Sequence, residues 1–228
     1  MIKFSKVSKK FPEGTVALSD ITFEIPDKQF LFVIGPSGAG KSTLLKLLTR
    51  ETELSSGSIF LDEEDITKIH HSKLPHLRQK IGNIFQDYRL LDDRTLWENV
   101  ALALEVRSRP EKEIKTTVEN VLELVGISDK KDLFPQQLSG GELQRTAIAR
   151  AIVGSPEVIL ADEPTADLDP KNSWEIIKLL SRINEQSGAI VVLATHNAEI
   201  VNTLKKRVIR LDRGKLVKDE KEGKYESV

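Results

Sequence analysis

The sequence of 228 residues contains no cysteine. Disulfide bonds, zinc sites built on thiolates and cysteine nucleophiles are therefore excluded, because each of them needs a cysteine side chain. The absence fits a reducing compartment.

Long hydrophobic runs are also missing. The longest, such as Phe30–Ile34 and Ala189–Ala194, are far shorter than the roughly 20 apolar residues that a membrane-spanning helix needs. The opening residues Met1–Lys6 lack the apolar stretch of a signal peptide. We therefore expect the chain to remain in the cytoplasm and to reach a membrane only through a partner.

An excess of basic charge is missing as well, since 34 Lys and Arg residues face 35 Asp and Glu residues and leave a net charge of -1. Proteins whose main partner is DNA or RNA usually carry a positive excess. The balance argues against nucleic acid as the main partner, although a local basic patch is compatible with a neutral total.

The residues that are present alternate between strand and helix patterns. Apolar runs and period-two alternation predict strands over Ile2–Val7, Leu18–Ile25, Phe30–Ile34, Ser58–Leu61, Ile81–Phe85, Val158–Ala161 and Ala189–Ala194. Helical spacing predicts helices over Lys41–Leu48, Glu142–Val153 and Lys171–Asn184, and a helical insertion from Leu96 to Val125. The rhythm indicates an α/β fold with a mostly parallel sheet. The polar tail Lys218–Val228 is interpreted as a frayed end or a short lid.

A glycine-rich loop follows the buried strand Phe30–Ile34 and fits the pattern G-x-x-x-x-G-K-[ST]. Such loops cradle phosphates with backbone N–H groups, while the lysine neutralises phosphate charge and the hydroxyl of the next residue binds Mg²⁺. The pattern arises by chance in roughly 1% of such chains, and the alternative is a plain glycine turn. The predicted nucleotide-binding residues are Gly35, Pro36, Ser37, Gly38, Ala39, Gly40, Lys41, Ser42 and Thr43.

A pair of carboxylates, Asp162 and Glu163, follows the buried strand Val158–Ala161. The end of a strand in an open α/β sheet lies where ligands bind, so Asp162 is suited to hold Mg²⁺ and Glu163 to polarise an attacking water. Alone, the pair is also typical of an acidic turn that ends a strand. Together with the phosphate loop, it predicts hydrolysis of ATP.

Further motifs occur in the order typical of the ABC ATPase family, which the chain resembles over essentially its whole length. They are the signature Leu138-Ser139-Gly140-Gly141-Glu142, a Q-loop glutamine Gln86, a D-loop Ala166–Asp169, a switch histidine His196 and an aromatic residue, Phe11. Ser139 with Glu142 three residues later is also a capping-box pattern, and both interpretations are compatible.

The resemblance implies a role for each of these residues. Two copies would face each other head to tail, so that Ser139, Gly140, Gly141 and Glu142 of one copy bind the ATP held by the other. Gln86 would sense Mg²⁺ and the attacking water, and His196 would hydrogen-bond the γ-phosphate. Glu163 would be the general base, and Phe11 would stack on adenine, although a Phe in a strand is usually part of the core. The implied catalytic set is Lys41, Gln86, Glu163 and His196, and the implied metal ligands are Ser42, Gln86 and Asp162.

The family also implies the architecture. We expect a P-loop NTPase fold with a mostly parallel core sheet, an N-terminal antiparallel β region and an inserted helical subdomain. The expected limits are 1–228 for a single ABC ATPase domain and about 88–154 for the helical subdomain that carries the signature.

The stretch Asp87–Val100 resembles the cell-division members of this family. That resemblance implies an FtsX-like integral membrane partner and control of cell-wall hydrolysis in bacteria. The alternative is the ATPase of a lipoprotein-releasing or macrolide-export transporter. A soluble ABC protein acting on DNA or the ribosome would need coiled coils, zinc modules or a second ATPase domain, and the sequence has none. One departure from the cell-division pattern is Thr165–Leu168, where those proteins usually carry Gly-Asn before the leucine, which puts details of signalling through the D-loop in doubt.

The segment Arg89–Val106 is the candidate for contact with the membrane partner. Within it, Leu96, Val100 and Leu104 are equally well explained as the buried face of a helix. Leu90, Leu91 and Asp92–Arg94 are the better contact candidates. The histidines at 70, 71 and 76 are interpreted as part of a solvated face rather than as a metal site.

Overall fold

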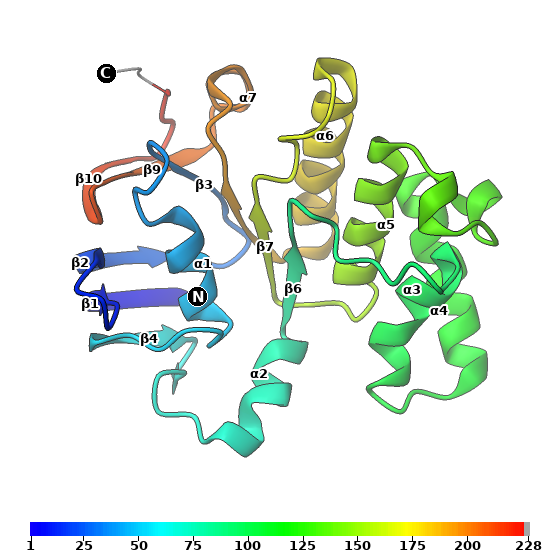
Figure 1. Ribbon diagram of the computed structural model, residues 1–228, viewed down its shortest axis with the longest axis horizontal. Coiled ribbons are helices and arrows are strands. Elements are labelled where there is room, and N and C mark those ends of the chain that lie inside the picture. The colour runs from blue at the N-terminus through cyan, green and yellow to red at the C-terminus, as the bar shows by residue number, and fades with distance from the viewer. Residues whose placement is uncertain (226–228) are drawn as a thin grey trace.

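The computed structural model describes residues 1–225, which form two sheets and a set of helices (Figure 1). The strands are β1 (Ile2–Lys10), β2 (Val16–Ile25), β3 (Phe30–Ile34), β4 (Ser56–Leu61), β5 (Glu64–Asp65), β6 (Ile81–Ile84), β7 (Val158–Asp162), β8 (Ile190–Ala194), β9 (Arg207–Asp212) and β10 (Lys215–Glu220). The α-helices are α1 (Lys41–Leu48), α2 (Leu74–Gln79), α3 (Leu96–Glu105), α4 (Glu111–Val125), α5 (Gly140–Ile152), α6 (Pro170–Ser187) and α7 (Ala198–Leu204). Short 3₁₀ helices are η1 (His71–Lys73), η2 (Ser128–Lys130) and η3 (Pro135–Gln137).

The larger sheet has six strands in the order β10-β9-β3-β8-β7-β6. Neighbours from β9 to β6 run parallel, and only β10 pairs antiparallel with β9. The smaller sheet, β2-β1-β4-β5, is antiparallel throughout. The predicted α/β fold with a mostly parallel core sheet and an N-terminal antiparallel region is confirmed.

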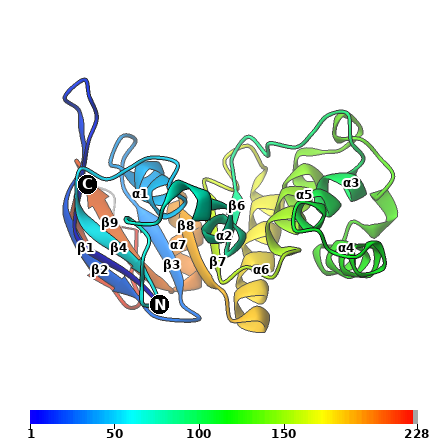
Figure 2. The same ribbon diagram turned by 90° about the horizontal axis from the view of Figure 1, so that it is seen from below.

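Each face of the six-stranded sheet supports its own hydrophobic core. Along β3, Phe30, Phe32 and Ile34 pack with the helices α3–α7, whereas Leu31 and Val33 pack with α1, α2 and the antiparallel sheet. Covering on both faces explains why all five residues of this strand are apolar and buried. Figure 2 shows the two sheets at one end of the molecule and α3, α4 and α5 gathered at the other.

The helical layer is built from local signals in the sequence. Thr95 caps α3 by accepting a hydrogen bond from the N–H of Glu98, and Gly126 ends α4 in the left-handed conformation with φ 75°. Leu96, Val100 and Leu104 lie in the core, so their interpretation as the buried face of a helix is confirmed.

The C-terminal region differs from the expectation. The prediction of a frayed end or lid from Lys218 onward is wrong for 218–220, which complete β10. This edge strand alternates between exposed and half-buried residues, and it is held by backbone pairing with β9 and by Leu216, which packs against the core. Residues 226–228 of the predicted tail lie outside the described residues.

Within residues 1–225, no helix combines the length and the hydrophobicity needed to cross a membrane.

Candidate functional site

The loop between β3 and α1 depends on its glycines. Gly35 has φ 151° and Gly40, the N-cap of α1, has φ 103°, both in the region that favours glycine. A Cβ atom on Gly35 would lie 2.2 Å from the Leu211 carbonyl oxygen, and one on Gly40 would lie 2.5 Å from that of Ala17. The loop therefore approaches two neighbouring backbones so closely that a side chain at either position would displace it.

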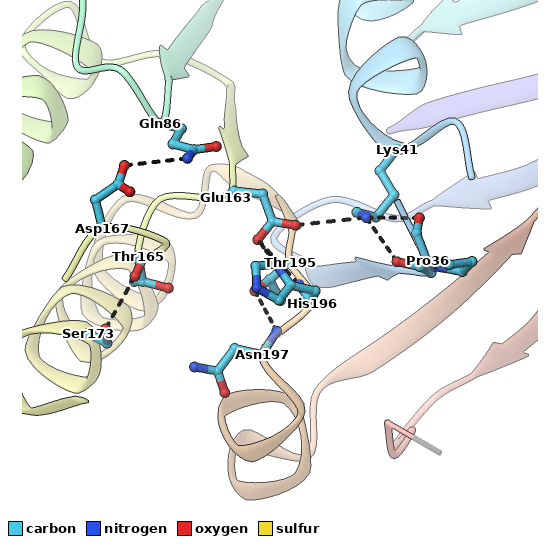
Figure 3. Close-up of polar contacts among 11 residues, drawn as sticks. Pro36, Lys41, Gln86, Glu163, Thr165, Asp167, Ser173, Thr195, His196 and Asn197 are labelled. Carbon is cyan, nitrogen blue, oxygen red and sulfur yellow. Dashed lines mark hydrogen bonds and ion pairs between the residues drawn. The ribbon is translucent and has the colours of Figure 1, made fainter. Parts of the chain in front are cut away.

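Lys41, the first residue of α1, directs its side chain back to the start of this loop. Its Nζ donates to the carbonyl oxygens of Gly35 at 2.9 Å and Pro36 at 3.3 Å, and it lies 3.8 Å from Oε1 of Glu163 (Figure 3). The side chain is nearly buried, so its charge is weakly screened by solvent. The loop thus brings a cation next to the N-terminus of α1, whose first N–H groups have no partner within the helix, as a phosphate site requires.

Glu163 and His196 meet because they follow neighbouring parallel strands, β7 and β8. Oε2 of Glu163 lies 2.9 Å from Nδ1 of His196 and accepts a hydrogen bond of 3.3 Å from the His196 backbone N–H. Glu163 has φ 47°, an uncommon conformation for a residue with a side chain and one that recurs at functional sites. Lys41, Glu163 and His196 therefore form one polar cluster beside the loop (Figure 3).

Asp162, the last residue of β7, has a carboxyl oxygen without a hydrogen-bond partner among the described residues. Its Oδ1 is buried and accepts no hydrogen bond from residues 1–225. Burial raises the pKa of Asp162, a hydrogen bond from Ser42 opposes that rise, and the negative charge of Glu163 adds to it. Ser42, Asp162 and Gln86 all line one cavity of about 370 Å³. Hydroxyl, carboxylate and amide oxygens are the ligands that Mg²⁺ prefers, so these residues fit a magnesium ion.

Gln86 lies just after β6 and faces the D-loop, where its Nε2 is 3.4 Å from Oδ2 of Asp167 (Figure 3). Arg150, on α5, donates to the carbonyl oxygens of Tyr88 at 2.7 Å and Arg89 at 2.5 Å. The segment after Gln86 is thereby fixed to the helix that follows the signature. Sequence reasoning missed Arg150, because its partners are backbone atoms some sixty residues away and no local pattern marks them.

The signature lies at the start of α5 and is tightly packed on its inner side. A Cβ atom on Gly140 would lie 3.3 Å from the Tyr88 hydroxyl, and one on Gly141 would lie 3.1 Å from Oδ1 of Asn172. Ser139 is exposed, and its N–H donates to Oε2 of Glu142 at 2.8 Å, one half of the predicted capping box.

The signature does not meet the phosphate loop of its own chain. None of Ser139, Gly140, Gly141 and Glu142 lines the cavity that contains Ser42 and Asp162. Figure 1 shows α5 on the opposite side of β7 and α6 from α1. The two predicted phosphate-binding segments therefore lie apart, one at the N-terminus of α1 and the other at the N-terminus of α5.

Phe11 follows the end of β1, in the connection to β2 that projects from the rest of the molecule in Figure 2. It is partly exposed and belongs to neither hydrophobic core, and Lys9 Nζ lies 4.8 Å from its ring centroid. The alternative, that Phe11 is part of the core, is wrong. Its role in stacking on adenine stays a prediction.

The three histidines at 70, 71 and 76 are all exposed, as a solvated face requires. Residues 1–225 contain no cluster of three or more His, Cys, Asp or Glu side chains arranged to hold a metal ion.

Comparison with known proteins gives three findings. The sequence profile of the ABC transporter family matches residues 18–166. The cell division ATP-binding protein FtsE of Bacillus subtilis (strain 168) is 49% identical over 227 residues, covering 100% of this chain and 99% of its own length, and that of Streptococcus pneumoniae serotype 2 is 48% identical over 225 residues, covering 99% and 97%. The dimeric ATP-binding cassette MJ0796, in a post-hydrolysis state bound to ADP and Pi, superposes with a TM-score of 0.89 at 32% identity and covers 99% of this chain and 100% of its own.

Proposed function

This chain belongs to the ABC transporter family, as one of its ATP-hydrolysing cassettes, and on that premise we propose that it is the ATPase of an FtsE–FtsX-like complex in bacterial cell division. Its ATP hydrolysis would control cell-wall hydrolysis across the membrane. The observation that carries the enzymatic part is the cluster of Lys41, Glu163 and His196 beside the glycine loop. The division role is supported by the near full-length similarity to FtsE proteins.

The proposed chemistry assigns one task to each residue of the cluster. Lys41 and the N–H groups at the start of α1 neutralise the β- and γ-phosphates. Glu163 accepts the proton of the attacking water, and its carboxylate lies between Lys41 and His196, the two side chains that would flank the γ-phosphate. His196 donates to a γ-phosphate oxygen, and Gln86 positions the water. Catalysis here would come from positioning and charge stabilisation rather than from a covalent intermediate.

Ser42, Asp162 and Gln86 would hold Mg²⁺. When bound, the ion neutralises charge that develops on the β- and γ-phosphate oxygens. The buried Oδ1 of Asp162, which has no partner within the described residues, supports this assignment.

The composite site needs a second copy of the chain. Ser139, Gly140, Gly141 and Glu142 lie away from the phosphate loop of their own chain, so they would reach an ATP only on a facing copy. The dimer of MJ0796 offers a precedent for two cassettes assembling in this family. Phe11, on its projecting connection, would stack on adenine. We infer a homodimer closed by ATP, in which each nucleotide contacts both chains.

The membrane partner would dock near the start of α3. Leu91 is 41% exposed, and Asp92, Asp93 and Arg94 are exposed beside it. An FtsX-like integral membrane protein contacting this segment would hold the chain at the cytoplasmic face of the cell membrane. The segment belongs to a helical subdomain that we place at about 88–154 within a single ABC ATPase domain spanning 1–228.

The direct test of the partner is purification of the chain with the membrane protein encoded beside it. Recovery of a four-span protein with a large extracytoplasmic loop, and ATPase activity that responds to that protein alone, is the expected result. Strong stimulation by a lipoprotein or a macrolide would instead assign the chain to a lipoprotein-releasing or macrolide-export transporter, an alternative that no observation favours at present.

The test of the catalytic assignment is Glu163→Gln. Loss of a general base should lower turnover on the order of a hundredfold or more, while the amide preserves the shape of the site and ATP binding. The variant should also accumulate as an ATP-bound dimer, because the dimer opens only after hydrolysis. Release of inorganic phosphate measures the turnover, and light scattering measures the mass of the dimer. Hydrolysis at the parent rate would remove Glu163 from the role of base.

A further inference from the structure

Glu142 creates an electrostatic conflict in the composite site proposed above. Its carboxylate lies in the first turn of α5, one hydrogen bond away from Ser139, the residue that would meet the phosphates of the facing copy. A carboxylate there is favourable for the helix dipole but repels an incoming triphosphate. Compensation of this charge would therefore strengthen binding of the ligand.

Both oxygens of the Glu142 carboxylate are engaged within the chain. Oε2 accepts the hydrogen bond from the Ser139 N–H, and Oε1 forms an ion pair with Nζ of Lys130. Lys130 and the Ser139 N–H together lower the pKa of Glu142 to about 2, so protonation does not relieve the repulsion at physiological pH. The Lys130 side chain is 36% exposed and that of Glu142 is 23% exposed, so solvent only partly screens the attraction between their charges.

Lys130 is held in position by the fold rather than extended freely from the surface. It is the last residue of η2, the short helix that begins directly after the buried Ile127. The carbonyl oxygens of Lys131 and Leu133 accept hydrogen bonds of 2.9 and 2.8 Å from the first two N–H groups of α3. The segment that carries Lys130 is thereby attached to the helix whose entry we assign to the membrane partner.

We propose that Lys130 is a positioning residue of the composite site, which cancels the charge of Glu142 and keeps its carboxylate on the Ser139 N–H. With the pair formed, the start of α5 adds no net negative charge and its remaining N–H groups are available to the phosphates of the facing ATP. The inference rests on the proposed function, because it requires that the signature binds the nucleotide of a second copy. It makes a specific demand: Lys130 matters only while residue 142 is charged.

The experiment measures ATP-driven dimerisation by sedimentation velocity in the Glu163→Gln background, where hydrolysis does not interfere. Within that background, the effect of Lys130→Met on dimerisation is measured twice, once with Glu142 retained and once with Glu142→Gln. We expect Lys130→Met to weaken dimerisation on the order of tenfold when Glu142 is present, and by no more than about twofold when it is replaced. Lys130→Arg should restore dimerisation, and the tenfold effect should shrink as salt is added.

Lys131→Met is the matched control, since this neighbouring lysine pairs with Glu119 at 3.8 Å and not with the signature. An equal loss from Lys130→Met in both backgrounds would mean that Lys130 acts independently of the carboxylate, and the proposal would be overturned. Unimpaired dimerisation of Lys130→Met at low salt would overturn it too. If the Glu163→Gln protein itself does not dimerise with ATP, the composite site of the proposed function fails first, and the role of Lys130 with it.

Discussion

At the residue scale, Asp162 is a buried polar group that lowers the stability of the protein. A carboxylate oxygen that is buried without a partner is unfavourable, because desolvation is not repaid by a hydrogen bond. The raised pKa of Asp162 expresses the same cost, with burial as its first cause. Such a group is retained where a ligand, here the proposed Mg²⁺, supplies the missing partner.

We therefore predict that Asp162→Asn stabilises the ligand-free protein and abolishes Mg²⁺-dependent hydrolysis. The melting temperature should rise by a few degrees at neutral pH, since about 1 kcal/mol corresponds to roughly 2–4 °C in a protein of this size. Thermal unfolding in EDTA measures the shift.

The pH dependence provides the control for this variant. A carboxyl group whose pKa is higher in the folded than in the unfolded state binds more protons when folded, so its cost is present at high pH and is relieved as pH falls through the raised pKa. The advantage of Asp162→Asn over the parent should thus shrink towards acidic pH. An advantage that is absent at neutral pH, or that grows on acidification, would contradict the account of Asp162 as an uncompensated buried charge.

At the scale of elements, α3 packs into the core, whereas the segment just before it is exposed and could contact a partner. Its inward face, Leu96, Val100 and Leu104, is buried in the core, while the preceding Leu91 leaves 41% of its surface exposed. An exposed leucine is common by itself. Next to the charged Asp92–Arg94, it is the exposed apolar side chain that we propose as a contact with the partner.

Leu91→Asp should therefore prevent binding of the membrane partner without lowering stability by more than about 0.5 kcal/mol, the usual range for surface substitutions. The control is Val217→Asp on β10, a hydrophobic side chain that is 54% exposed and remote from this segment in the fold. Co-purification of each variant with the membrane protein is the measurement. Equal recovery of the partner with both variants would place the contact elsewhere, and a large loss of stability in Leu91→Asp would make Leu91 part of the core.

At the scale of the whole molecule, the phosphate loop and the signature lie on separate sides of α6, and we propose that neither makes a complete site alone. Complementation between chains tests this arrangement. Lys41→Ala removes the loop lysine, Ser139→Arg blocks the signature, and either variant alone should hydrolyse almost no ATP.

An equimolar mixture of these two variants should recover about a quarter of the parent activity. In a head-to-tail dimer, half of the dimers formed at random are mixed, and each mixed dimer has one of its two sites free of both substitutions. Phosphate release at saturating ATP measures the recovery. A mixture as inactive as its components, with mixed dimers demonstrated by tagged chains, would show that the two features do not cooperate across an interface.

The sequence by itself determined the parts that rest on local patterns. The loop Gly35–Ser42 predicts a phosphate-like ligand because glycines, lysine and serine at that spacing follow a buried strand, and β3 and α1 have the predicted bounds. The helical insertion was also predictable, because Leu96, Val100 and Leu104 repeat at the helical period. The strand β10 was not, since an edge strand of charged residues carries no hydrophobic period and depends on pairing with β9.

Only the tertiary structure decided which distant residues meet. The cluster of Lys41, Glu163 and His196 forms because three chain segments end at the same edge of one parallel sheet. Two further contacts join loops and helices whose separation along the chain follows no pattern. They are the hydrogen bond from Arg150 to the Tyr88 carbonyl oxygen and the ion pair of Lys130 with Glu142. Local spacing specifies what a segment can bind, whereas chain packing fixes which charges oppose or compensate one another there.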